Sequence, residues 1–416
     1  MAIQTDIIIV GGGSVGLHCA YYLLKAGRKV TLVEQNQIGD GSSSGNAGQI
    51  VPSHIIPLAA PGIVSTAFKW MLDSKNSPFG MKFSLDPTYI LWLIKFAASC
   101  NDANVQQAIP PLNAIGQLST TNFSQIITQE KFECAYQEKG VLFLYKDAKA
   151  FEDGIEEGKV MQKHGIPIEV LDQEAIRKFE PVILDSIVGG INMSGDSNVN
   201  PAVYLKLLGE RLREMGAEIY ENTSVTGFDL VAGKIQGVKT SAGVFEANEV
   251  ILAAGAATPI VGRDLRLNIP VQSARGYSMT ISAPKKMPRQ PLLLGERRVA
   301  VSPMGDLLRF TGRLELSNVD RTVNQKHIVG IERAVREYMQ LEEKLDVKET
   351  WAGLRPTTPD GVPIIGRSAR YKNLIIATGH AMLGLSLGPG TGQVVSELVS
   401  GQKSAFDLSP LRIERF

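Results

Sequence analysis

Apolar positions at the start of the chain fall into two short runs, and an amphipathic stretch separates them. Residues 6–10 predict a buried strand, residues 14–26 predict a helix that ends at Gly27, and residues 29–34 predict a second strand. Strand–helix–strand order is typical of a parallel sheet covered by helices. The opening of the chain therefore indicates an α/β fold.

The middle and the end of the chain repeat this order. A helix is predicted over 201–215, because Asn200 suits its N-cap, Pro201 its first turn and Gly216 its C-terminal cap. The other predicted elements are short strands near Val225, Ile235 and Val244, a strand in the run 249–255, a strand at 373–378 and a helix at 390–400 closed by Gly401.

We expect two interleaved domains, because no repeat and no linker rich in serine and proline separates the regular parts. Residues 1–55, 194–268 and 350–416 are predicted to form a Rossmann-type domain. Residues 56–193 and 269–349 are predicted to form a mixed-sheet, substrate-binding domain that caps it. The expected fold class is α/β in the first domain and α+β for the chain as a whole.

Composition narrows the classes of partner. The 416 residues are 44% hydrophobic with a formal net charge of +1, so there is ample core material but no field for capturing nucleic acid. The three cysteines form no C-x-x-C pair, which argues against a redox disulfide or a zinc site, and we expect no metal. The start of the chain lacks the positive residues of a signal peptide, so we expect a cytoplasmic protein. Nothing in the pattern indicates an oligomeric state.

The apolar segment 89–98 is too short to cross a bilayer, which needs about 20 apolar residues. It predicts a buried helix. The alternative is an interfacial helix in peripheral contact with the inner face of a membrane or with a membrane partner.

A glycine motif follows the first predicted strand. Gly11, Gly13 and Gly16 match G-x-G-x-x-G, in which the glycines permit a tight turn, close approach of a pyrophosphate and close helix packing. The helix N-terminus attracts phosphate, and Glu34 ends the next strand where it can accept hydrogen bonds from ribose hydroxyls. These features predict a dinucleotide site. Its further expected contacts are Ser14, Val15 and Gln35.

Two features favour FAD over NAD. No second G-x-G-x-x-G unit is present, which disfavours a reductase that carries both FAD and a pyridine nucleotide. The loop 41–50 is rich in glycine and small polar residues, so its backbone can lie against a large flat ring. The Rossmann-type unit is therefore expected to be an FAD-binding domain. The expected flavin contacts in this loop are Ser42, Ser43, Asn46, Ala47, Gly48 and Gln49.

With these residues, the sequence resembles the D-amino-acid dehydrogenase and glycine oxidase group of the D-amino-acid oxidase family. The likeness spans nearly the whole chain and is greatest to the bacterial D-amino-acid dehydrogenases. The segments that carry it are the opening fold, the loop 42–50, residues 57–62 and 69–71, residues 351–361 (WAGLRPTTPDG) and residues 378–388 (TGHAMLGLSLG).

The resemblance implies roles for single residues. Arg355 is expected to hold the substrate carboxylate, because a guanidinium pairs with a carboxylate through two parallel hydrogen bonds. The carbonyl of Met382 is expected to accept a hydrogen bond from the substrate amine. An adenine-side contact is expected at Val225, near the Ala254–Gly255 turn. The expected contacts with the flavin pyrimidine edge are Leu383, Gly384, Leu385 and Ser386, just before the helix 390–400.

The sequence also departs from the family pattern. The sarcosine-oxidase branch tethers its flavin through a cysteine near the Arg355 segment, but no cysteine follows Cys134, so we expect non-covalent FAD. Eukaryotic D-amino-acid oxidases add a tyrosine from a central strand to the carboxylate clamp, and residues 298–309 hold no equivalent. Tyr277 and His54 are the candidates that remain for the pocket, although isolated residues of either type are more often structural.

The predicted activity is oxidation of a small D-amino acid by hydride transfer from Cα to flavin N5, giving an imino acid that hydrolyses to a 2-oxo acid and ammonia. The dehydrogenase-like segments favour a quinone or another respiratory acceptor. Three alternatives stay open. Segment 50–57 suggests D-proline or cis-4-hydroxy-D-proline as substrate, glycine or sarcosine oxidation by oxygen is the second, and a non-catalytic FAD subunit is the third.

Overall fold

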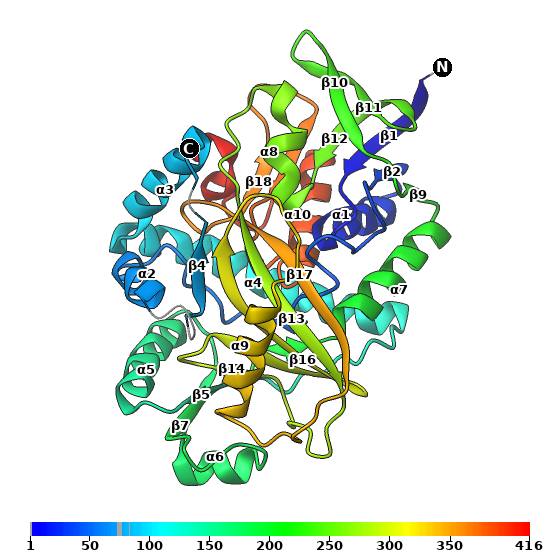
Figure 1. Cartoon of the computed structure of the whole chain (residues 1–416). Helices are drawn as coiled ribbons and strands as arrows, with labels where there is room; N and C mark the ends of the chain where they lie inside the picture. Colours follow the sequence, from blue (N-terminus) through cyan, green and yellow to red (C-terminus); the bar gives the residue numbers. More distant parts are fainter. Residues whose placement is uncertain (1, 73–76, 83) are drawn as a thin grey trace.

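The computed structural model describes residues 2–72, 77–82 and 84–416, and two large sheets dominate it (Figure 1). The first sheet has the order β10-β11-β12-β1-β2-β9, with β19 beside β12 and β18 beside β19. Its strands are β1 (Ile3–Val10), β2 (Val30–Val33), β9 (Glu218–Tyr220), β10 (Val225–Val231), β11 (Lys234–Thr240), β12 (Gly243–Leu252), β18 (Ile364–Arg367) and β19 (Leu374–Thr378).

The centre of the first sheet is parallel and buried on both faces. β1 pairs in parallel with β2 and β12, and residues 7–10 and 30–33 are buried. One core cluster packs helices against these strands, and a second packs the β10–β11 hairpin against them. The helices of the first cluster are α1 (Ser14–Lys25), α7 (Pro201–Glu214) and α10 (Gly388–Val399). The parallel, helix-covered sheet confirms the expected α/β class.

The caps of α7 follow the sequence expectation. The Asn200 side chain accepts a hydrogen bond from the backbone N–H of Val203, and Pro201 occupies the first turn. Gly216 has a φ of +94°, in the left-handed region that glycine adopts without steric cost. Local sequence therefore determines where this helix begins and ends.

The second sheet is mixed and has nine strands. Their order is β17-β13-β16-β15-β14-β5-β7-β6, with β4 beside β16. The strands are β4 (Phe79–Met81), β5 (Val141–Tyr145), β6 (Ile168–Asp172), β7 (Gly189–Met193), β13 (Gln272–Ser282), β14 (Leu292–Leu294), β15 (Val299–Met304), β16 (Leu307–Leu316) and β17 (Val347–Thr357). The remaining α-helices near it are α2 (Ile63–Leu72), α5 (Ala148–Lys163), α6 (Gln173–Phe179) and α9 (Gln325–Arg336). A two-stranded sheet pairs β3 (Gln49–Ile50) with β8 (Ser197–Asn198).

Two elements cross the boundaries expected from the sequence. β17 pairs with β13 along its length and so belongs to the second sheet, although the sequence division at residue 350 assigns most of it to the FAD-binding domain. Helix α4 (Asp102–Glu130) lies in the expected cap, but its Ile115 and Phe123 are part of the core that includes α1 and α10. We propose domain boundaries that assign β17 to the substrate-binding domain and α4 to the FAD-binding domain.

Helix α3 (Pro87–Ser99) contains the apolar segment 89–98 and is only half buried. Tyr89 and Trp92 are buried, whereas Ile90, Leu91 and Ile94 are 40%, 51% and 60% exposed. The expectation of a buried helix is therefore wrong, because only one face of α3 finds a packing partner. Among the residues that the structure describes, no helix has the length and apolar character needed to cross a membrane.

Candidate active site

A large cavity lies where the ends of β1 and β2 meet a face of the second sheet. Its walls come from the start of α1, the loop 41–47, residues 253–257 after β12, strand β17 and the turn 380–385. Segments from the whole length of the chain therefore meet at one place. In open parallel sheets, ligands bind at this carboxyl edge of the strands.

The glycine turn at this edge fits a dinucleotide. Gly11 has a φ of +112°, and a Cβ there would lie 2.5 Å from the carbonyl oxygen of Ala253. A Cβ on Gly16 would lie 1.9 Å from the carbonyl oxygen of Gly11, so only glycine lets α1 pack this close. Gly13 supplies no side-chain cap to α1, and the N–H of Ser14 donates to Ser43 Oγ at 3.0 Å, while the helix dipole favours a bound anion at this N-terminus. Ser14 and Val15 line the cavity beside it.

Glu34 is held at the cavity wall by backbone donors. Its Oε2 accepts a hydrogen bond from the N–H of Gly12 at 2.7 Å, and its Oε1 accepts one from the N–H of Asn36 at 3.0 Å. Each carboxylate oxygen has a further lone pair that can accept from a ribose hydroxyl. Gln35 lines the cavity next to it.

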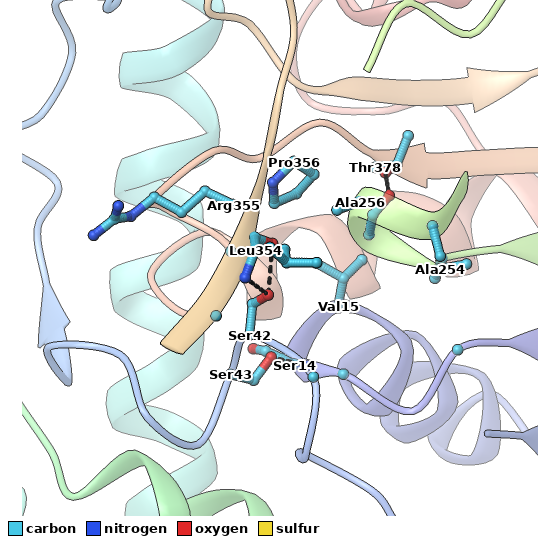
Figure 2. A pocket seen from close by; sticks show the side chains of 18 of the residues that line it. Ser14, Val15, Ser42, Ser43, Ala254, Ala256, Leu354, Arg355, Pro356 and Thr378 are labelled. Carbon is cyan, nitrogen blue, oxygen red and sulfur yellow. Dashed lines mark hydrogen bonds between the residues drawn. The ribbon is translucent and has the colours of Figure 1, made fainter. Parts of the chain in front are cut away.

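The loop after β2 is fixed against the second sheet. Ser42 Oγ donates to the carbonyl oxygen of Leu354 at 2.5 Å and accepts from its N–H at 2.9 Å (Figure 2). Arg309 Nη1 donates to the carbonyl oxygens of Ser44 and Asn46, at 2.7 and 3.0 Å. The loop therefore presents a preformed wall to the cavity. Its lining members are Gly41, Ser42, Ser43, Asn46 and Ala47.

Two residues expected at the flavin do not line the cavity with the rest of this loop. Gln49 turns its amide away, toward the carbonyl oxygen of Leu292 and the hydroxyl of Ser302, at 3.4 and 3.3 Å. The N–H of Gly48 donates to the side chain of Asn46 at 2.7 Å. Both residues stabilise the loop from the side that faces away from the cavity.

Val225, Ala254 and Gly255 line the cavity, and their contact with an adenine stays a prediction. Thr223 and Ser224, which were not predicted, line it beside them.

Arg355 on β17 is a half-buried cation in the cavity wall. Its guanidinium lies over Gly276 of β13, where a Cβ would be 2.3 Å from Cζ of the arginine. Its Nη1 donates a hydrogen bond to the carbonyl oxygen of Arg313 at 2.8 Å, and no acidic side chain pairs with it among the residues that the structure describes. Burial lowers the pKa of Arg355 to about 10, so the group is charged at neutral pH. Figure 2 shows this side chain extending away from Ala254 and Thr378. A cation in a cavity wall without an acidic partner is suited to bind an anion.

The turn after β19 lies next to Arg355. The N–H of Ala381 donates to the carbonyl oxygen of Pro356 at 2.8 Å, and Ala381 has a φ of +47°. Met382, Gly384 and Leu385 line the cavity from this turn. The turn is therefore fixed to the residue that follows Arg355 in β17.

Leu383 and Ser386, also expected at the flavin, pack behind the turn. The hydroxyl of Ser386 accepts a hydrogen bond from the N–H of Val51 at 2.9 Å, and its carbonyl oxygen accepts one from Ser119 at 2.6 Å. Leu383 packs against the apolar cores. Both side chains support the turn rather than line the cavity.

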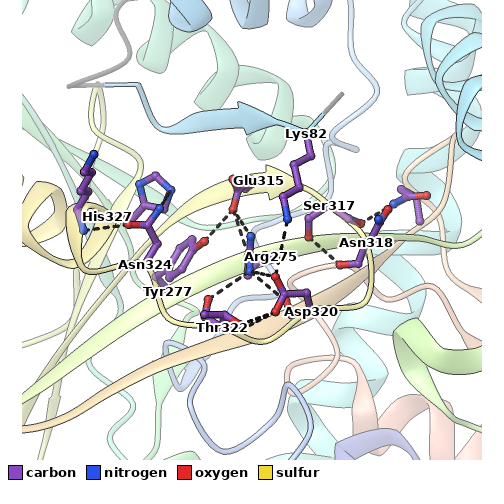
Figure 3. A network of polar contacts seen from close by, with 12 residues as sticks. Lys82, Arg275, Tyr277, Glu315, Ser317, Asn318, Asp320, Thr322, Asn324 and His327 are labelled. Atoms are coloured by element: carbon purple, nitrogen blue, oxygen red, sulfur yellow. Dashed lines mark hydrogen bonds and ion pairs between the residues drawn. The ribbon is translucent and has the colours of Figure 1, made fainter. Parts of the chain in front are cut away.

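Tyr277 lies on the opposite face of β13 from Gly276. Its hydroxyl donates to Glu315 Oε2 at 2.7 Å, and its ring packs edge-on against His327 of α9 (Figure 3). Arg275 joins the same network through ion pairs with Glu315 and Asp320. Tyr277 is thus directed away from the cavity, and its expected place beside the substrate is not where the structure puts it.

His54 lies apart from Arg355. Its ring packs near Phe143, at 6.0 Å between centroids, in a core that includes Val51 and Ile55. Burial lowers the pKa of His54 to about 4, so the ring is neutral at pH 7. No residue of segment 50–57 lines the described part of the cavity, so the geometry gives that segment no contact with a substrate.

Sequence reasoning missed several lining residues. His380 lines the cavity with its Nε2 3.0 Å from Thr391 Oγ1, and burial lowers its pKa to about 3. Gly276, Thr311 and Trp351 line it from the second sheet. The sequence signal for these three residues is the alternation of side chains along β13, β16 and β17. This alternation identifies the face that lines the cavity only once the register is known. The described residues contain no cluster of side chains that could hold a metal ion.

Comparisons with known proteins agree with this geometry. Residues 6–398 match the DAO family, described as FAD dependent oxidoreductase. A D-amino acid dehydrogenase of Helicobacter pylori is 31% identical over 396 residues, covering 95% of each chain. One of Xanthobacter autotrophicus is 30% identical over 419 residues, covering 99% of each chain. The crystal structure of glycine oxidase from Geobacillus kaustophilus superposes with a TM-score of 0.79 at 22% identity, covering 100% of both chains, and so shares the fold.

Proposed function

Because the chain belongs to the DAO family of FAD-dependent oxidoreductases, we propose that it oxidises the Cα–N bond of a small D-amino acid. The cofactor is FAD, and the chain is an FAD-dependent amino acid dehydrogenase or oxidase. The observation that carries the finer proposal is Arg355, a half-buried cation without an acidic partner among the described residues, in the same cavity as the cofactor-binding loops. The D configuration rests on the names of relatives at about 30% identity.

Arg355 is suited to bind the substrate carboxylate. Its Nη1 is held by the carbonyl oxygen of Arg313, which leaves the edge formed by Nε and Nη2 for two carboxylate oxygens. The desolvated surroundings that lower its pKa also strengthen this pairing. Binding at this edge would fix the direction of the Cα–H bond.

The substrate amine would lie at the turn 380–385. Family likeness assigns its acceptor to the carbonyl of Met382, and the bond from Ala381 to Pro356 ties this turn to the strand that carries Arg355. A neutral amine has the lone pair that drives loss of hydride from Cα, so we assign no side-chain base. When bound, FAD supplies the acceptor for this hydride. The imino acid then hydrolyses in water to a 2-oxo acid and ammonia.

The N-terminus of α10 would act through its field. The N–H of Gly388 donates to the carbonyl oxygen of Leu385, and the N–H of Gly390 donates to the hydroxyl of Ser119. These groups are therefore occupied, but the aligned peptide dipoles still favour negative charge beside residues 384–386. Such a field would stabilise the electron-rich product of hydride transfer.

We further propose that the electrons pass to a quinone and that the exposed face of α3 contacts a lipid surface. This face consists of the side chains Ile90, Leu91 and Ile94, and Leu85 is exposed just before the helix. These exposed apolar side chains suit the apolar boundary of a bilayer.

Anaerobic mixing of the purified holoenzyme with single amino acids tests the proposal. We expect a D-amino acid such as D-alanine to bleach the flavin absorbance, and L-alanine to leave it unchanged. Comparing D-proline, cis-4-hydroxy-D-proline and glycine ranks the alternative substrates. A flavin that none of these compounds bleaches would contradict the proposed activity and favour a non-catalytic FAD subunit.

The acceptor is tested separately, with whichever compound bleaches the flavin. We expect reduction of a quinone analogue without formation of hydrogen peroxide. Stoichiometric oxygen uptake with peroxide release would identify an oxidase instead.

A further inference from the structure

Three polar side chains stand in one row across the second sheet without a hydrogen-bond partner. Ser278 of β13 lies directly opposite Thr311 of β16 on one side and Trp351 of β17 on the other. Ser278 Oγ, Thr311 Oγ1 and Trp351 Nε1 are all buried, and none has a partner in the described part of the chain. We call these three residues the Thr311 row.

The Thr311 row lies on the cavity face of the sheet, close to Arg355. Thr311 and Trp351 line the same cavity as Arg355 and Gly276, and Ser278 lies between them, fully buried. The guanidinium of Arg355 lies over Gly276, which is two residues from Ser278 on the same face. Residues so spaced along a strand are about 7 Å apart. A carboxylate on Arg355 and the Thr311 row are thus within reach of one small molecule.

In the neighbouring row on the same face of the sheet, the polar side chains are hydrogen-bonded or ion-paired. Arg309 Nε donates to Thr280 Oγ1 at 2.9 Å, and Arg309 Nη2 pairs with Glu349 at 3.2 Å. Buried polar groups are nearly always hydrogen-bonded in folded proteins, because leaving them unpaired is costly. Three unpaired groups side by side in a cavity wall therefore point to a ligand that completes them.

We propose that the Thr311 row binds a hydroxyl group on the substrate side chain, so that the preferred substrates are small D-amino or cyclic imino acids with a hydroxyl on Cβ or Cγ. This inference rests on the proposed function. A hydroxyl both donates and accepts, as two serine or threonine hydroxyls and an indole N–H require of a common partner. The carboxylate has its own receptor in the free edge of Arg355, and the row is neutral.

Isosteric substrate pairs test the proposal. We expect kcat/KM for D-serine to exceed that for D-2-aminobutyrate, and that for D-threonine to exceed that for D-valine, each by about tenfold or more. Replacing Thr311→Val or Ser278→Ala should bring these ratios to within about threefold of one. Ser273→Ala is the matched control, because its hydroxyl is also buried and unpaired in the described structure but belongs to the opposite face of β13. It should leave the ratios unchanged.

A binding experiment separates this inference from the proposed function. The shift in flavin absorbance of the holoenzyme is titrated with 3-hydroxypropionate and with butyrate, which differ only in a terminal hydroxyl or methyl group and cannot be oxidised at a Cα–N bond. We expect tighter binding of 3-hydroxypropionate in the wild type and equal binding in Thr311→Val.

Equal binding of the two acids in the wild type, or ratios that Thr311→Val leaves unchanged, would overturn the inference and assign the row to ordered water. If both members of each substrate pair lose efficiency equally, the row serves the carboxylate or the fold, and the inference also fails. A flavin that no amino acid bleaches would contradict the proposed function, while the binding titration would still report on the row.

Discussion

Arg355 shows how one residue can define a site by what surrounds it. The two buried arginines Arg275 and Arg309 of the second sheet pair with Glu315 and Glu349. Arg355 has only a carbonyl oxygen among the described residues. Gly276 provides the space in which the guanidinium lies. A group this isolated keeps its charge available for a ligand.

Replacing Arg355→Met should raise KM for the best substrate by about 100-fold or more, because a desolvated, charge-assisted pair is lost. Arg355→Lys should recover only part of this loss, since an ammonium group cannot form the two parallel bonds. Steady-state kinetics measure the effect, and the flavin absorbance of both variants should match the wild type. A KM that stays within twofold of the wild-type value would remove Arg355 from the site.

Asp196 is a buried carboxyl group beside Ser53. Its carboxylate accepts hydrogen bonds from the N–H and the hydroxyl of Ser53, at 3.2 and 2.7 Å, and burial raises its pKa to about 7. The folded state therefore favours neutral Asp196. The resulting stability is fully present below the unfolded pKa, near 4, and is lost as pH rises through 7.

Asp196→Asn removes this titration. We expect the free energy of unfolding of the variant, relative to the wild type, to increase between pH 4 and pH 8, by the order of 1–3 kcal/mol. Urea unfolding at the two pH values measures the change. If the difference in the free energy of unfolding between variant and wild type does not vary with pH, the carboxyl group of Asp196 does not lie in a buried site that lacks a cation.

At the scale of elements, the loop between β16 and α9 links the second sheet to the loop that follows β2. Asp320 in this loop accepts hydrogen bonds from the N–H and hydroxyl of Thr322, and pairs with Arg275 at 2.8 Å (Figure 3). These contacts lower the pKa of Asp320 to about 2 and so keep it ionised. The next residue, Arg321, lines the cavity and donates hydrogen bonds to Asp40 in the loop that follows β2.

Arg321→Gln should weaken FAD binding by about two- to fivefold, because the link across the cavity is lost and an exposed ion pair contributes about 1 kcal/mol or less. Quenching of free FAD fluorescence by the apoprotein measures the dissociation constant. Arg412→Gln is the control, because it removes an exposed ion pair, with Glu414, that does not line the cavity. Equal effects of the two substitutions would indicate a general charge effect rather than a specific link.

The exposed face of α3 makes a separate prediction. Leu91→Ser combined with Ile94→Ser should reduce co-sedimentation with phospholipid vesicles several-fold, because apolar area available to the bilayer interface is lost. Val329→Ser on α9, where the valine is 62% exposed, is the matched control and should bind vesicles as the wild type does. Vesicle binding that is absent in the wild type, or unaffected by the double substitution, would argue against a lipid contact.

At the scale of the whole molecule, the cavity has one wall on each sheet. FAD is therefore expected to stabilise both sheets together, whereas an adenine nucleotide would occupy only the end lined by Val225 and Ala254. Calorimetry of the apoprotein should show a lower Tm, and FAD at 100 times its dissociation constant should stabilise by about 2.7 kcal/mol. ADP should raise the Tm less than FAD. Equal shifts from ADP and FAD would mean that the flavin half makes no stabilising contact.

The Rossmann-type unit and the family could be predicted from the pattern of residues alone, and the same pattern predicts the dinucleotide site. These features are local: Gly11, Gly16 and Glu34 are spaced along one strand–helix–strand segment, and the caps of α7 lie within a few residues of its ends. Local spacing and backbone conformation are encoded by neighbours in the chain, so a pattern is enough to identify them. The assignment of Arg355 came from family likeness, and its isolation in the cavity wall became visible only in the fold.

Which face of an element is buried, and which side chains meet, depends on the packing of the folded chain. Tyr277 and Gly276 are adjacent in sequence, yet one joins the network under α9 and the other lies beneath Arg355, because side chains alternate along a strand. A shift of register between β13 and β16 lies at this point, and no local sequence pattern predicts it. The same holds for the exposed side of α3, and for the Thr311 row, whose members come from three strands. Contacts between distant segments depend on strand pairing and packing, which the order of residues along one segment does not contain.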